Sequence, residues 1–123
     1  MAPFTFRGDF VYGEFQEEYD YTRTQDYIKQ SINLCRQNDC NKMLMDIRGV
    51  TGKISTWDRF KLAQYLLNNY GRNMRVVVVY RPEDVNRFFE DVVVNRGGKF
   101  RIFTDLASAC KWLGIEENSV VVK

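Results

Sequence analysis

The residues best suited to chemistry lie together in one stretch, "DIRGVTGKIST", residues 46–56. It places an acid, a Gly-Lys pair and two hydroxyl residues between a strand-like run and a helix-like run. A phosphate-binding loop of the Walker type needs a glycine five positions before the Gly of Gly-Lys and a hydroxyl residue directly after the lysine. Here Ile47 takes the first of these positions and Ile54 follows Lys53. The spacing excludes a nucleotide loop and leaves a strand that ends in a loop and enters a helix.

Asp46 is the acid of this stretch, and it ends a run that is typical of a buried strand. Two interpretations are open. Asp46 either positions a loop hydroxyl or accepts a hydrogen bond from a partner, or it satisfies the backbone amides of the following turn. A reaction at this place would need Asp46, Lys53 and Ser55 to converge.

The chain contains no histidine. This removes the usual general base and both the Ser–His and the Cys–His nucleophile systems. The three cysteines, Cys35, Cys40 and Cys110, do not have the paired spacing of a zinc site. Because Cys35 and Cys110 fall on apolar helix faces, we expect both to be small core residues. We therefore expect no enzyme, no metal and no cofactor.

Composition narrows the class of the protein. At 123 residues with 45% hydrophobic content, the chain fits one domain with a substantial core. Its 18 basic and 16 acidic residues leave a net charge of +2, so we expect no nucleic-acid partner. No run approaches the roughly 18 apolar residues of a membrane span, so we expect no integral membrane contact. The start lacks a signal-peptide pattern and the cysteine number is odd, which favours a reduced, cytoplasmic setting.

Hydrophobic spacing predicts strands and helices in alternation after an N-terminal hairpin. Parallel strands joined by helices call for a mainly parallel sheet, so the predicted fold class is α/β. We expect a mixed sheet of four to five strands with an antiparallel hairpin and four crossover or flanking helices, in a single domain over 1–114 with a C-terminal tail, 115–123. The predicted strands are 3–6, 10–15, 42–50, 75–80 and 100–104, and the predicted helices lie within 21–39, 55–71, 82–98 and 105–114.

The expected starts and faces of the helices follow from single residues. Thr22 and Gln25 have the spacing of a capping box for the first helix. Ser55 or Thr56 is expected to cap the second helix. Its apolar face is expected to hold five residues: Trp57, Phe60, Ala63, Leu67 and Tyr70.

Two segments carry a resemblance to a known family. They are "MLMDIRGVTG", residues 43–52, and "FFEDVVVNRGGKFRIFTDLASACKWLG", residues 88–114. The second is the more specific, since a helix, an Asn-Arg-Gly-Gly turn, a strand, Thr-Asp and an Ala-x-x-Trp-Leu helix follow one another. From Phe10 to Gly114 the chain resembles the STAS-like proteins (sulfate transporter and anti-sigma factor antagonist fold), within them the stand-alone SpoIIAA-like group. The resemblance implies a regulatory or binding module without catalysis.

The resemblance also implies a switch site and a protein partner. In the sigma-regulator branch, a serine at the end of the loop after the central strand is phosphorylated by a partner kinase, which releases the partner. The matching position here is Thr56, with Ser55 beside it, although the chain reads Ile-Ser-Thr-Trp where that branch has Asp-Ser-Ser-Gly. The residues of this expected partner loop are Asp46, Gly52, Lys53, Ser55, Thr56 and Trp57.

An alternative function is the carriage or sensing of a lipophilic small molecule. The SpoIIAA-like group is associated with lipid-carrier-like folds, and this chain has more aromatic residues than one face per helix must bury. A cavity between helices and sheet would hold an acyl or ring-shaped ligand. The expected lining residues are Phe60, Tyr65, Phe88, Phe89 and Trp112. A homodimer is a further expectation, because the edge strand of the hairpin and the "SVVVK" tail could each pair with a strand of a second copy.

Overall fold

Strands and helices alternate along the chain in the computed structural model, in the order that the sequence predicts. The structure describes residues 3–69, 73–82, 87–95 and 98–120, without the side chains of 87–89. The elements are β1 (Phe4–Phe6), β2 (Val11–Glu14), α1 (Tyr21–Gln37), β3 (Lys42–Asp46), α2 (Thr56–Asn69), β4 (Arg75–Val79), α3 (Arg87–Asn95), β5 (Lys99–Phe103) and α4 (Leu106–Leu113).

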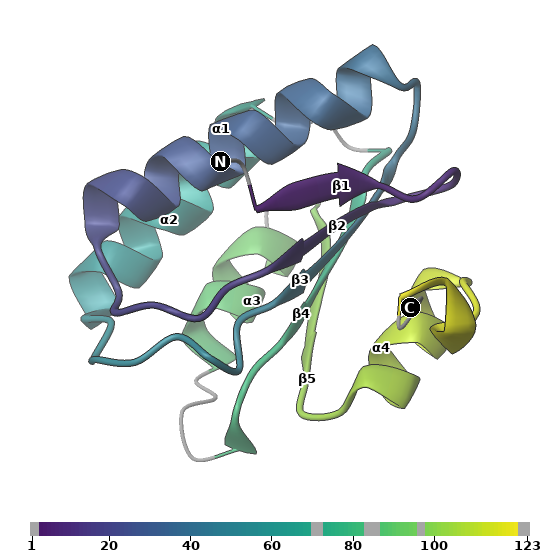
Figure 1. Ribbon diagram of the computed structural model, residues 1–123. Helices are drawn as coiled ribbons and strands as arrows, with labels where there is room; N and C mark the ends of the chain where they lie inside the picture. Colours follow the sequence, from purple (N-terminus) through teal and green to yellow (C-terminus); the bar gives the residue numbers. More distant parts are fainter. Residues whose placement is uncertain (1–2, 70–72, 83–86, 96–97, 121–123) are drawn as a thin grey trace.

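The strands form one five-stranded mixed sheet in the order β1-β2-β3-β4-β5. β1 and β2 pair antiparallel, and Gly8 in their turn has a φ of 86°. The remaining pairs are parallel. Each parallel step advances in the same direction, so right-handed crossovers place α1, α2 and α3 on one face of the sheet. Figure 1 shows these three helices on one side and α4 on the other. The predicted α/β class and its antiparallel hairpin are confirmed.

The sheet is buried on both faces. The four valines of β4 are all buried, as the continuous apolar run predicts. Val76 and Val78 belong to the core beneath α1–α3, whereas Val77 and Val79 belong to the core beneath α4. Successive side chains of a strand point to opposite faces, so β4 supplies both cores.

Helix starts and faces differ from the sequence prediction in two places. The N-cap of α1 is Asp20, whose carboxylate accepts a hydrogen bond from the Arg23 amide, so the predicted Thr22–Gln25 capping box is wrong. On α2 the buried residues are Leu62, Ala63 and Leu66. Trp57 lies outside this face and is 65% exposed, so its predicted place on the buried face is also wrong. Tyr70 lies outside the described residues.

Part of the expected tail packs against the domain. Residues Glu117–Ser119 form a 3₁₀ turn, and Val120 is buried in the core beneath α4. A guanidinium nitrogen of Arg7 donates to the carbonyl oxygens of Ser119 and Val120, at 2.9 and 3.1 Å. Residues 115–120 are thus fastened to the turn between β1 and β2, while 121–123 lie outside the described residues.

Candidate functional site

The loop after β3 leaves the carboxyl end of the parallel sheet, where ligands of α/β folds bind. Hydrogen bonds from the backbone and from one arginine side chain hold its first half in place. The Ile47 amide donates to the Val79 carbonyl at 2.9 Å, and a guanidinium nitrogen of Arg81 donates to the Val50 carbonyl at 2.7 Å. Gly49 lies close to β2's continuation, since a Cβ there would lie 2.7 Å from the Phe15 carbonyl oxygen. The start of the loop is therefore anchored.

Asp46 stabilises the start of the loop, and its side chain is buried. Its Oδ1 accepts from the Arg48 amide at 3.1 Å and from Arg48 Nε at 2.9 Å, and its Oδ2 accepts from Arg48 Nη2 at 2.7 Å. The hydrogen bond to this carboxylate raises the pKa of Arg48. Of the two interpretations of Asp46, the structure agrees with the second: the carboxylate satisfies the turn that follows it.

The second half of the loop is exposed. Gly52 turns the chain with a φ of 88°. Directly before that turn, the Thr51 amide donates to the Glu17 carbonyl and the Tyr19 amide donates to the Thr51 carbonyl, at 2.9 and 2.8 Å. Beyond these contacts the side chains point outward: Lys53, Ser55, Thr56 and Trp57 are all exposed.

Ser55 begins α2. Its Oγ accepts from the Asp58 amide at 3.0 Å, and its carbonyl accepts from the Arg59 amide at 3.0 Å. These are the two bonds of an N-cap. Of the two capping residues that the sequence allowed, the structure selects Ser55, and Thr56 is the first residue of the helix.

Trp57 forms an aromatic surface at the start of α2. Its ring stacks on Phe60, with centroids 5.8 Å apart and planes 20° apart. The ammonium of Lys61 lies 5.8 Å from the centroid of Trp57 and 4.2 Å from that of Tyr21. We refer to residues 51–57 together with Phe60 and Lys61 as the loop–helix surface.

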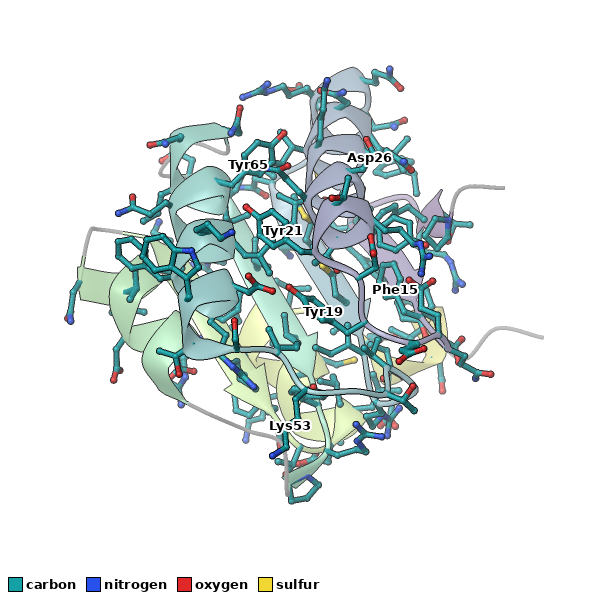
Figure 2. All side chains as sticks on the ribbon, turned by 90° about the vertical axis from the view of Figure 1, so that its left-hand side faces the viewer. Phe15, Tyr19, Tyr21, Asp26, Lys53 and Tyr65 are labelled. Carbon is teal, nitrogen blue, oxygen red and sulfur yellow. The ribbon has the colours of Figure 1, made fainter. Side chains whose placement is uncertain are left out.

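Tyrosines occupy the seam between α1 and α2, beside this surface. Figure 2 shows Tyr19, Tyr21 and Tyr65 there, with Lys53 at the loop below. The Tyr19 hydroxyl donates to Asp58 Oδ2 at 2.9 Å, and Lys61 pairs with the other oxygen of Asp58 at 3.7 Å. Burial and the hydrogen bond to Asp58 raise the pKa of Tyr19.

An apolar cavity of about 130 Å³ lies between the sheet and helices α1 and α2. The deep lining residues are buried: Ile28, Leu62, Leu66, Val76, Val78, Tyr80, Phe100 and Ile102. The lining residues of intermediate exposure mark its mouth: Thr24, Met45, Ile47, Ile54 and Arg59. Ile54 belongs to the loop and Arg59 to the first turns of α2. The mouth therefore adjoins the loop–helix surface.

Three of the aromatic residues expected to line a pocket, Phe60, Tyr65 and Trp112, do not line this cavity. Phe60 is half-buried against Trp57, and Tyr65 is half-buried in the seam with α1. Trp112 packs on the core beneath α4, on the opposite face of the sheet. The side chains of Phe88 and Phe89 lie outside the described residues. No local sequence pattern predicts the observed lining residues, because they come from five elements that are distant in sequence.

The cysteines behave as expected in the described structure. Cys35 and Cys110 are buried, and burial raises the pKa of both thiols. Among the described residues, no three metal-ligating side chains are grouped to hold an ion. In the same part of the chain, no helix has the length and apolar character needed to cross a membrane.

Comparison with known proteins adds no assignment. No protein-family model matches the chain, and a search of curated proteins finds no match. The resemblance to the STAS-like proteins stays a prediction.

Proposed function

We propose that the protein is a STAS-like regulatory module that binds a protein partner through the loop–helix surface and does no catalysis. One observation carries the proposal: Trp57, at the centre of this surface, is 65% exposed and is held in place by stacking on Phe60. Tryptophan, with tyrosine and arginine, is enriched among the residues that carry most binding energy at protein interfaces. A large, rigid ring also loses little conformational entropy when it is covered.

The position of the loop–helix surface in the fold also supports a role in binding a protein partner. The surface lies at the carboxyl end of the parallel strands, and the first half of its loop is anchored by Asp46 and Arg81. An anchored loop presents its exposed half without a large ordering cost on binding. A mixed surface of two aromatic residues, two lysines and three hydroxyl residues suits a protein partner better than it suits an apolar membrane.

Thr56 is the proposed point of regulation. Ser55 makes the cap bond, so a phosphate on Thr56 leaves that bond intact. The phosphate would stand at the N-terminal end of α2, where partial positive charge and backbone amides favour an anion. It would also add about −1.5 to −2 charge units to the partner-facing surface. Phosphorylation of Thr56 would therefore leave the fold intact and change the affinity for the partner.

Partner capture with matched variants tests the proposal. Wild type, Trp57→Ala and Val94→Ala would each be used to retain proteins from an extract of the source organism, followed by affinity measurement on the isolated partner. Val94 is an exposed apolar residue on α3 and serves as the control. We expect Trp57→Ala to weaken the partner's affinity about tenfold or more, as at an interface hot spot. Equal affinities for the two variants would contradict the proposal.

The apolar cavity favours a second candidate function, the binding of an apolar small molecule. Its lining is almost entirely aliphatic and aromatic, and its mouth opens beside the loop. Extraction of the freshly purified protein, followed by mass analysis, tests this function. One molecule recovered per chain supports it. An empty protein that also takes up no apolar compound contradicts it.

A further inference from the structure

The volume of the cavity restricts what can occupy it. A cavity of about 150 Å³ lined by aliphatic and aromatic residues binds benzene. Sites for drug-sized ligands are larger, at roughly 300–1,000 Å³. At about 130 Å³, this cavity accommodates a single ring and excludes most of a long acyl chain.

The buried lining of the cavity is apolar apart from Tyr80, and the charged lining residue Arg59 lies at the mouth. Ile28, Leu62 and Ile102 are buried lining residues without polar side-chain atoms. Burying an apolar ring against them is favourable, while burying a charge there is costly. A charged group on the occupant must therefore stay at the mouth, near Arg59.

The guanidinium of Arg59 is positioned to bind an anion at the mouth. Its Nε donates to the Ile54 carbonyl oxygen at 3.2 Å, which fixes the guanidinium beside the mouth. The terminal nitrogens present the geometry that matches a carboxylate. Among the described residues, no carboxylate forms an ion pair with Arg59, and the adjacent Asp58 is engaged by Tyr19 and Lys61. Arg59 also stands near the positive end of α2.

We propose that the cavity is a binding site for a single-ring aromatic carboxylate, with the ring between α1, α2 and the sheet and the carboxylate on Arg59. This inference rests on the second candidate function and narrows it to one ligand class. It is independent of the proposed protein partner.

Methyl NMR with benzoate as the probe tests the site. Benzoate would be titrated into protein labelled at the isoleucine methyl groups. Resonances of Ile28 and Ile102, deep in the cavity, are expected to shift saturably with one site per chain. Arg59→Gln is expected to weaken benzoate binding about tenfold or more, because a charge-assisted bidentate contact is lost. Arg75→Gln, an exposed arginine at the other end of the sheet, is expected to bind as wild type does.

Benzene and dodecanoate complete the experiment. Benzene is expected to shift the same methyl resonances equally in wild type and Arg59→Gln, which also shows that the cavity survives the substitution. Ile54→Phe is expected to block both ring probes, whereas Val94→Phe is not.

Equal benzoate affinity in wild type and Arg59→Gln would overturn the assigned class, as would dodecanoate binding more tightly than benzoate. In the second case apolar-ligand binding would survive. If no probe binds, both this inference and the second candidate function fail.

Discussion

Asp46 and Arg48 illustrate how single residues set up the candidate surface. Their three hydrogen bonds close the turn at the end of β3, so the loop leaves the sheet in one direction. An acid within an apolar run was visible in the sequence, and one of its two interpretations was this turn. What the sequence did not reveal was Arg48, because its role depends on a backbone turn rather than on periodicity.

The Asp46–Arg48 contact predicts a specific stability effect. Asp46→Ala removes the acceptors of all three Arg48 hydrogen bonds and leaves the Arg48 amide without its partner. We expect a loss of about 1–3 kcal/mol in the free energy of unfolding, measured in urea. Glu116→Gln, at an exposed position, is the control and should change little. A loss no larger than that of the control would show that the contact does not stabilise the loop.

Tyr19 predicts a dependence on alkaline pH. Burial and Asp58 raise its pKa above the ordinary value of 10.0, so the folded protein holds the phenol proton more tightly than the unfolded chain does. This contribution to stability is complete below about pH 10 and is lost as the pH rises further. We expect the unfolding free energy of wild type to fall more steeply above pH 10 than that of Tyr19→Phe. Parallel curves for the two proteins would contradict the assignment.

At the scale of elements, periodicity predicted which segments are helices and placed Cys35 and Cys110 on buried helix faces, but it placed Trp57 on the buried face of α2 wrongly. The spacing of Trp57 and Phe60 is equally compatible with a buried stripe and with an exposed pair. Packing against α1, α3 and the sheet buries Ala63, as predicted, together with Leu62 and Leu66. In α1, likewise, Asp20 wins over Thr22 as the cap. Trp57 can form part of a candidate site because it is exposed, contrary to what helical periodicity predicts.

The start of α2 gives a test that separates two adjacent hydroxyl residues. Ser55→Ala removes the bond to the Asp58 amide and should cost about 1 kcal/mol of unfolding free energy. Thr56→Ala leaves the cap intact and should change stability by less than about 0.5 kcal/mol. Thermal and urea unfolding of both variants measure the difference. A larger loss of stability in Thr56→Ala than in Ser55→Ala would show that Thr56, and not Ser55, caps the helix.

At the scale of the whole molecule, the order of elements was predictable and the lining of the cavity was not. Alternating strands and helices admit few topologies, which is why the parallel sheet and the hairpin followed from the sequence. The cavity combines residues as far apart as Thr24 and Ile102. Likewise, only the folded chain brings Val120 beneath α4 and Arg7 to the carbonyls of Ser119 and Val120.

The C-terminal segment predicts an effect of truncation. Deleting residues 118–123 exposes the apolar site of Val120 and removes both acceptors of Arg7. Burial of one valine contributes about 1.5–3 kcal/mol, so the truncated chain should lose at least part of that amount. Deleting 121–123 alone is the matched control. Equal unfolding free energies for the two truncations would mean that residues 118–120 do not belong to the folded unit.

The central claim is that a protein partner covers the loop–helix surface, and site-specific photocrosslinking tests it most directly. A photoreactive phenylalanine analogue would replace Trp57 in one protein and Val94 in another, and both would be illuminated in the native extract. The account predicts one discrete crosslinked protein from position 57, reduced by a Thr56→Glu substitution, and none of that species from position 94. The same crosslinked protein from both positions, or from position 94 alone, would contradict it.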